Sequence, residues 1–143
     1  MQVLVEGRME KLTENQVIDY LCEWLHKNGW SILEKSKGHS QGIDVKAQKD
    51  DDILIVEAKG ARGNPESPVT TRAQFDSGQV KSHLGEAIVK ILEQKHQNPN
   101  AIVAIAQPDD PYIKNCLRDA IPEVVKCGIK LFWVKSASEV KEG

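Results

Sequence analysis

The apolar run Ile53–Val56, within the stretch DILIVEAK, most constrains how this chain can fold. Side chains on a β-strand point alternately to the two faces of the sheet, and here both alternating sets are apolar. Such a strand has to be covered on both faces. Because helical patterns occur before and after it in the sequence, we predict a central sheet with helices packed against both of its faces.

Helix and strand patterns alternate along the chain. Thr13 and Gln16 form a predicted capping box, and Gly29 is a typical helix stop. The polar connection KDDD predicts an antiparallel hairpin between two strands. The predicted elements are a helix between Thr13 and Gly29, strands at 30–36, 43–48 and 52–59, a helix at 79–96, a strand at 101–108, a helix at 112–128 interrupted at Pro122, and a strand at 129–135. The order α-β-β-β-α-β-α-β predicts an α/β fold of three layers, α-β-α, with a mixed central sheet.

The composition limits the classes of function. The chain has 143 residues, of which 40% are hydrophobic and 28% charged, which predicts one globular domain over 1–143. No apolar run is long enough to span a membrane, no signal peptide is evident, and the three cysteines lack metal-site spacing, so we expect a cytoplasmic protein without a membrane partner. The net charge of −2 argues against a generally basic nucleic-acid coat protein.

Three charged side chains are predicted to meet at one edge of the sheet. Glu57 and Lys59 lie on the same face of their strand, about 7 Å apart along it. Asp44 lies on the preceding strand, across the hairpin. Carboxylates of this kind can bind Mg²⁺, and a nearby lysine can stabilise charge on a phosphate. The alternative is a salt bridge at a strand end, with Asp44 as a solvated strand-edge residue.

The motif GIDV, a hairpin and the motif ILIVEAKG together resemble the PD-(D/E)XK nuclease superfamily, which has the restriction-endonuclease-like fold. The resemblance implies that Asp44 and Glu57 bind Mg²⁺, with Mn²⁺ as a substitute. It implies that Lys59 positions or activates the attacking water, and that the backbone carbonyl of Ala58 is a further metal ligand. Ile43 replaces the proline of the motif, as in its Mrr-like and Holliday-junction-resolvase-like variant.

The same resemblance implies a core of order αβββαβ over roughly residues 10–107, followed by a C-terminal αβ extension. It also implies that Glu14, at the start of the first helix, reaches the metal, and that Gln79 is catalytic. His83 stands where many members have a tyrosine, one turn after Gln79. Each residue has an alternative role: Glu14 favours the helix dipole anyway, Gln79 can cap a helix or be solvated, and His83 can lie half-exposed without a function.

Basic residues follow the Glu-x-Lys motif. Arg62, Arg72, Lys81 and His83 are candidate substrate contacts, because side chains of these types bind phosphate oxygens and position a nucleic acid without reading its sequence. The alternative is that they are ordinary solvated charges. No recognition helix or zinc finger is evident.

The sequence thus predicts a metal-dependent DNA phosphodiesterase, an endonuclease that leaves 5′-phosphate ends as the family implies. A homodimer suits duplex cleavage, and a nicking monomer is equally compatible. Two alternatives stay open: a catalytically silent DNA-binding or scaffold module of the same fold, and a nuclease of the same fold that acts on RNA.

Overall fold

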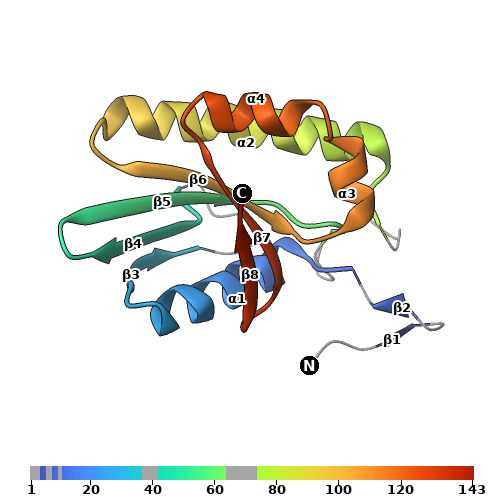
Figure 1. The fold of residues 1–143 in the computed structure, drawn as a ribbon, viewed down its shortest axis with the longest axis horizontal. Helices are drawn as coiled ribbons and strands as arrows, with labels where there is room; N and C mark the ends of the chain where they lie inside the picture. Colours follow the sequence, from blue (N-terminus) through green and yellow to red (C-terminus); the bar gives the residue numbers. More distant parts are fainter. Residues whose placement is uncertain (1–3, 6–7, 10, 37–41, 64–73) are drawn as a thin grey trace.

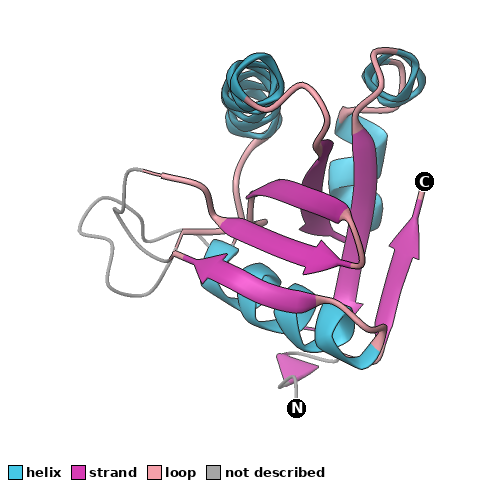
Figure 2. Ribbon diagram, turned by 90° about the vertical axis from the view of Figure 1, so that its left-hand side faces the viewer, coloured by secondary structure: helices cyan, strands magenta, loops and turns pink. Residues whose placement is uncertain are grey.

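The computed structural model describes residues 4–5, 8–9, 11–36, 42–63 and 74–143. Its helices are α1 (Glu14–Lys27), α2 (Ser77–Gln97), α3 (Pro111–Cys116) and α4 (Ala120–Lys126). Its strands are β1 (Leu4–Val5), β2 (Arg8–Met9), β3 (Ser31–Lys35), β4 (Val45–Lys49), β5 (Asp52–Ala58), β6 (Ile102–Pro108), β7 (Lys130–Ser136) and β8 (Glu139–Glu142). Figures 1 and 2 show helices on both faces of one sheet, which confirms the predicted three-layer α/β fold.

The main sheet has six strands in the order β3-β4-β5-β6-β7-β8. The three central strands β5, β6 and β7 are parallel, and the outer pairs β3–β4, β4–β5 and β7–β8 are antiparallel. The connections of the parallel strands run through α2 and through α3 and α4, which cover one face, while α1 covers the other (Figure 1). The carboxyl ends of β5 and β6 and the start of β4 therefore meet at the same edge of the sheet.

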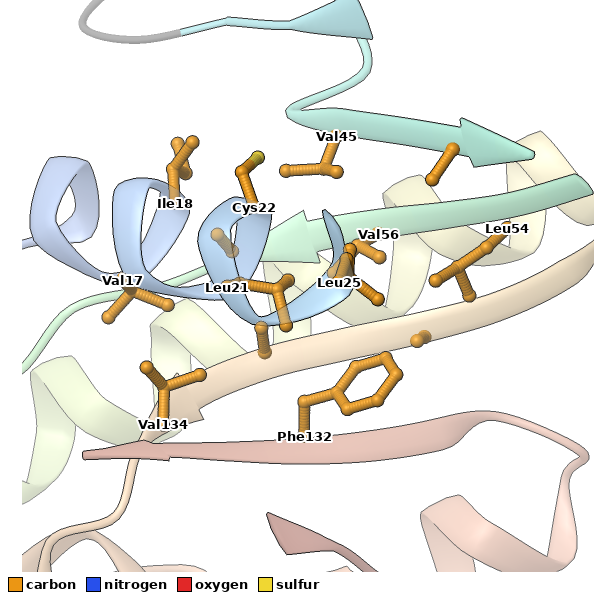
Figure 3. Packing of buried hydrophobic residues seen from close by; sticks show 14 of the residues in the cluster. Val17, Ile18, Leu21, Cys22, Leu25, Val45, Leu54, Val56, Phe132 and Val134 are labelled. Carbon is orange, nitrogen blue, oxygen red and sulfur yellow. The ribbon is translucent and has the colours of Figure 1, made fainter. Parts of the chain in front are cut away.

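One core lies between α1 and the sheet (Figure 3). The helix begins with the predicted capping box, in which the Gln16 N–H donates to Thr13 Oγ1 at 3.2 Å and the Thr13 N–H donates to Gln16 Oε1 at 2.8 Å. The stripe of apolar residues on α1 packs against alternate residues of β4, β5 and β7. The labelled members of this core are Val17, Ile18, Leu21, Cys22, Leu25, Val45, Leu54, Val56, Phe132 and Val134.

A second core lies on the opposite face, under α2, α3 and α4. From β5 it takes Ile55, and from β6 Val103 and Ile105, the residues that alternate with those of the first core. The helix α2 contributes its buried stripe, which consists of Val80, Leu84, Ala87 and Ile91. The two cores account for the apolar residues on both faces of β5. Among the described helices, none has both the length and the apolar character of a membrane span.

Two predictions about the C-terminal part were wrong in detail. The helix expected at 112–128 is two short helices, and the break lies between Cys116 and Ala120 instead of at Pro122. Pro122 sits in the first turn of α4, where a missing backbone N–H costs no helical hydrogen bond. The strand β8 was not predicted, because its four residues, EVKE, are mostly exposed and charged at the edge of the sheet.

Candidate active site

Asp44, the residue before β4, lies next to Glu57 of the adjacent strand β5. The ladder pairs Val45 with Val56, so the next pair toward the sheet edge is Asp44 and Glu57. Both valines face the α1 core, and by alternation both acids face the α2 side. Asp44 is only 9% exposed and Glu57 only 5%. The Ala58 N–H donates to Asp44 Oδ2 at 2.9 Å, which fixes this carboxylate against the end of β5.

The environment of Glu57 disfavours its charged form. Burial, followed by the charge of the neighbouring Asp44 carboxylate and a side-chain hydrogen bond with it, raises the pKa of Glu57 to about 8. Lys90 opposes this rise, since its Nζ lies 3.5 Å from Glu57 Oε1. In turn, the charge of Glu57 raises the pKa of Lys90. Glu57 therefore holds a proton near neutral pH unless more positive charge reaches the pair.

Glu14 belongs to the same electrostatic group. It is the first residue of α1, and burial followed by the Asp44 charge raises its pKa to about 7, against the opposing charges of Lys59 and Lys90. An acid in the first turn is normally favoured by the helix dipole, but here burial and the Asp44 charge raise the pKa of Glu14. The structure thus brings Glu14 near Asp44.

Gly60 explains how α1 approaches the end of β5. A Cβ atom on Gly60 would lie 2.7 Å from the carbonyl carbon of Thr13 and would also contact the backbone of Glu14, closer than real Cβ atoms pack. The Ala61 N–H donates to the Leu12 carbonyl at 2.7 Å beside this contact. Only a glycine lets the two backbones come this close, and the close approach places Glu14 next to Lys59.

Lys59 continues the β5 strand toward the sheet edge. Its N–H donates to the Ala106 carbonyl at 2.9 Å, and its side chain shares the face of Glu57 by alternation. Its charge acts on the pKa of Glu14 and Glu57 and lowers that of His83. Ala58, whose carbonyl is the further metal ligand implied by the sequence, is buried at the same edge.

The helix α2 turns a polar stripe toward these residues. His83 is half-buried edge-on against Phe75, with ring centroids 4.4 Å apart, and burial followed by the Lys59 charge lowers its pKa. Glu86 and Lys90 act on the pKa of Glu14 as well. Glu86 and Lys90 were not predicted as site residues, although they follow His83 at helical spacing and so share its side of α2.

Gln79 has a structural partner in α2. Its Oε1 accepts from the Asp76 N–H at 2.9 Å, and Asp76 Oδ1 accepts from the Gln79 N–H at 2.8 Å, which makes a capping box. This is the capping alternative that the sequence left open. The catalytic role of Gln79 stays a prediction.

The predicted substrate contacts are scattered. The Arg62 Nε–H donates to the Lys11 carbonyl at 2.7 Å, and Arg62 also bridges to Thr13, so Arg62 holds the segment before α1 in place. Lys81 is exposed near the start of α2. Arg72 lies outside the described residues. Of the three predicted substrate contacts that the structure describes, His83 is the one that it brings to Lys59.

A divalent cation fits the donors of this site. Within the described part of the chain, no group of three or more His, Cys, Asp and Glu side chains is arranged to hold a metal. Mg²⁺ needs fewer protein ligands, because it keeps several waters and usually takes one or two carboxylates plus substrate phosphate. Burial and then the charge of Asp44 raise the Glu57 pKa, and a bound cation would offset the negative charge of the pair.

Comparison with known proteins supports the fold alone. No family model matches the sequence, and no curated protein matches it. Two solved structures are similar. An XisH family protein from Nostoc punctiforme has a TM-score of 0.56 and 15% identity, over 90% of this chain and 95% of that chain. An fdxN element excision controlling factor protein from Anabaena variabilis has a TM-score of 0.58 and 16% identity, over 89% of this chain and 96% of that chain. Identities of 15% and 16% show that the chain shares the three-layer fold of these proteins and nothing more.

Proposed function

We propose that this protein is a metal-dependent phosphodiesterase of the PD-(D/E)XK type that cleaves the DNA backbone as an endonuclease. The observation that carries the proposal is the pair of buried carboxylates, Asp44 and Glu57, with Lys59 on the same face of the sheet. Buried acids placed side by side cost free energy unless a partner balances their charge, and acids perturbed in this way are frequent at functional sites. The choice of DNA as substrate rests on the resemblance of the motifs.

Asp44 and Glu57 would hold Mg²⁺ or Mn²⁺, with the Ala58 carbonyl beside them. When bound, such an ion polarises the phosphate and lowers the pKa of a coordinated water. Lys59 would donate to the phosphate oxygens on which charge builds during cleavage. Glu14, with its pKa raised to about 7, is suited to accept or hold a proton near neutral pH.

Proton release is part of loading the site. Glu57, with a pKa of about 8, has to lose its proton before it can bind a cation, so metal affinity rises with pH up to that range. Lys90 Nζ lies 3.5 Å from Glu57 Oε1, and this ion pair weakens once Glu57 binds a cation. The basic side chains of α2 are then available for the phosphates that flank the cleaved bond.

The test is cleavage of labelled supercoiled plasmid, linear duplex, single strand, four-way junction and RNA, in Mg²⁺, Mn²⁺ or EDTA. Asp44→Ala and Lys59→Ala are compared with Asp109→Asn, an acid at the same sheet edge that is paired with lysines. Metal-dependent cleavage lost in the first two variants and kept in the third supports the proposal. Cleavage that survives in Asp44→Ala and Lys59→Ala contradicts it.

The same panel separates the alternatives. DNA binding that is indifferent to metal, without cleavage of any substrate, would indicate a silent binding module. Preferential cleavage of RNA would keep the site and change the substrate. Sedimentation with and without duplex DNA tests whether the protein acts as a homodimer or as a monomer.

A further inference from the structure

Gln107 is a buried polar residue that the proposed chemistry does not yet use. It lies near the end of β6 and is only 5% exposed. Its Oε1 is the one buried side-chain oxygen or nitrogen without a hydrogen-bond partner in the described part of the chain. Most buried polar atoms in native proteins are paired, so an unpaired one at a defined place points to a partner that arrives later.

The sheet register places Gln107 beside Lys59. The β5–β6 ladder ends with Ala58 opposite Ala106, and the bond from the Lys59 N–H to the Ala106 carbonyl carries the pairing one step further. The next pair in the same register is Lys59 and Gln107. Neighbouring strands lie about 4.8 Å apart, so two long side chains on the same face are within reach of each other.

Both side chains point to the α2 side of the sheet. Ala58 and Ala106 belong to the α1 core, so the residues that follow them face the opposite layer. Gln107 therefore lies beside Lys59 on the same face, two ladder pairs further out than Glu57. The buried amide borders the candidate active site from the β6 side.

On the β7 side of Gln107, the candidate cation is Lys114, which already has an ion-pair partner. The ladder pairs Gln107 with Trp133, and Lys114 Nζ lies 5.0 Å from the centre of the Trp133 ring. Lys114 is held by Asp109 Oδ1 at 2.7 Å, so its ammonium is already satisfied by a carboxylate. Lys59, the neighbour of Gln107 on the β5 side, is then the cation that we consider as the partner of the Gln107 amide oxygen.

We propose that Gln107 is a positioning residue of the active site, whose amide oxygen accepts a hydrogen bond from the Lys59 ammonium when metal and DNA are bound. This inference rests on the proposed phosphodiesterase function. An ammonium has three N–H donors on a flexible stem, and one fixed acceptor restricts where the other two point. Gln107 would thus direct Lys59 toward the phosphate while Glu57 binds the cation.

The experiment compares Gln107→Met, Gln107→Glu and the wild-type protein. Methionine keeps the length of the side chain and removes the acceptor, while glutamate keeps an acceptor oxygen. Gln48→Met, an exposed glutamine of the same sheet on β4, is the matched control. Each protein is measured in two ways: thermal unfolding with and without Mn²⁺ and a short DNA duplex, and cleavage kinetics.

We expect Gln107→Met to melt at the same or a higher temperature without metal and DNA, because an unpaired buried oxygen is gone. We expect its kcat to fall by about 10- to 100-fold with KM nearly unchanged, the range for residues that orient a catalytic group. Gln107→Glu should recover part of that loss. A kcat equal to that of Gln48→Met, or a variant that loses stability together with activity, would overturn the inference.

The unfolding measurement separates this inference from the proposed function. If the wild-type protein cleaves nothing in Mg²⁺ or Mn²⁺, the phosphodiesterase proposal fails, and the melting temperatures still test Gln107. Mn²⁺ with duplex should then stabilise the wild-type protein more than Gln107→Met. Equal stabilisation of the two, or no stabilisation of either, contradicts a role for Gln107 in the loaded site.

Discussion

Two groups of acidic residues lie at the same edge of the sheet and differ in how their charge is balanced. In the first group, Glu14, Asp44 and Glu57 gather around the end of β5. In the second, Asp109 and Asp110 follow the end of β6, and each has a lysine Nζ within 2.7 Å. The acids of the first group act mainly on one another, and those of the second act mainly on lysines.

The pKa shifts follow this difference. Burial followed by Asp44 raises the pKa of Glu57 to about 8. Burial also opposes ionisation of Asp109, but the hydrogen bond and charge of Lys114, with the charge of Lys141, hold the pKa of Asp109 below its usual range. Acids at a sheet edge are therefore not enough to indicate a metal site. The informative feature is a local excess of buried negative charge, which a cation can relieve.

The largest expected effect distinguishes the lysines of the two groups. Lys59→Ala should reduce kcat/KM for metal-dependent cleavage by about 100- to 1000-fold, the loss seen when one transition-state donor is removed. Lys114→Ala, which breaks the 2.7 Å pair with Asp109, should leave cleavage close to that of the wild-type protein. Single-turnover kinetics on one duplex substrate measure both. Equal losses of kcat/KM in the two variants would mean that the two groups of acids do not differ in function.

The dependence of stability on pH should have opposite signs in the two groups. For Glu57, the pKa is raised from 4.5 to about 8, so its contribution to stability is present below 4.5 and is lost as the pH rises toward 8. This loss corresponds to at most about 5 kcal/mol, and to less where solvent screens the charge. For Asp109, the pKa is lowered, so its contribution is present above 3.8 and is lost as the pH falls.

Denaturant unfolding between pH 2 and pH 8 measures these contributions. Glu57→Gln should flatten the decline above pH 5, and Mg²⁺ should flatten it in the wild-type protein. Asp109→Asn should leave that decline unchanged and reduce the loss of stability at the acid end. A wild-type protein that becomes more stable from pH 5 to pH 8 without metal would contradict the raised pKa of Glu57.

Two glycines should respond to the same substitution with opposite signs. Gly60→Ala places a Cβ against the backbone of Thr13 and Glu14, and we expect it to cost about 1–3 kcal/mol, as overpacking does. Gly85→Ala, in α2 with open space around it, should stabilise the protein by about 1 kcal/mol. Urea unfolding of both variants gives the comparison. If Gly60→Ala unfolds like the wild-type protein, the close approach of α1 to β5 is wrong.

The layers and the central acids could be predicted because they depend on local pattern. The residues Ile53–Val56 are apolar on both faces of their strand, so both faces had to be covered. The alternation of side chains along a strand, together with the hairpin, predicted that Asp44 lies next to Glu57. Gln107 could not be predicted in the same way, because its neighbour Lys59 comes from a strand about 50 residues earlier, and only the β5–β6 register joins them.

Other parts of the site depend on tertiary contacts that no local pattern contains. Lys90 reaches Glu57 only because α2 crosses back over β5, and Glu14 comes near Asp44 and Lys59 only because Gly60 lets two backbones touch. The break between α3 and α4 lies at 117–119 and was predicted at Pro122, for a related reason. A proline indicates that a helix cannot continue through it, and the same proline is tolerated in the first turn of a new helix.

The smallest expected effect concerns Gln79. It tests whether Gln79 acts in catalysis together with the first group of acids or only caps α2. Asp76→Ala and Gln79→Ala each break the capping box of α2, and each should cost about 1 kcal/mol of unfolding free energy. Because the Gln79 oxygen is bonded to the Asp76 N–H, we expect the two variants to cleave DNA at the same rate. Slower cleavage by Gln79→Ala alone, at equal stability, would show that the capping box opens when substrate binds. Gln79 would then have a catalytic role, as the resemblance to the nuclease superfamily implies.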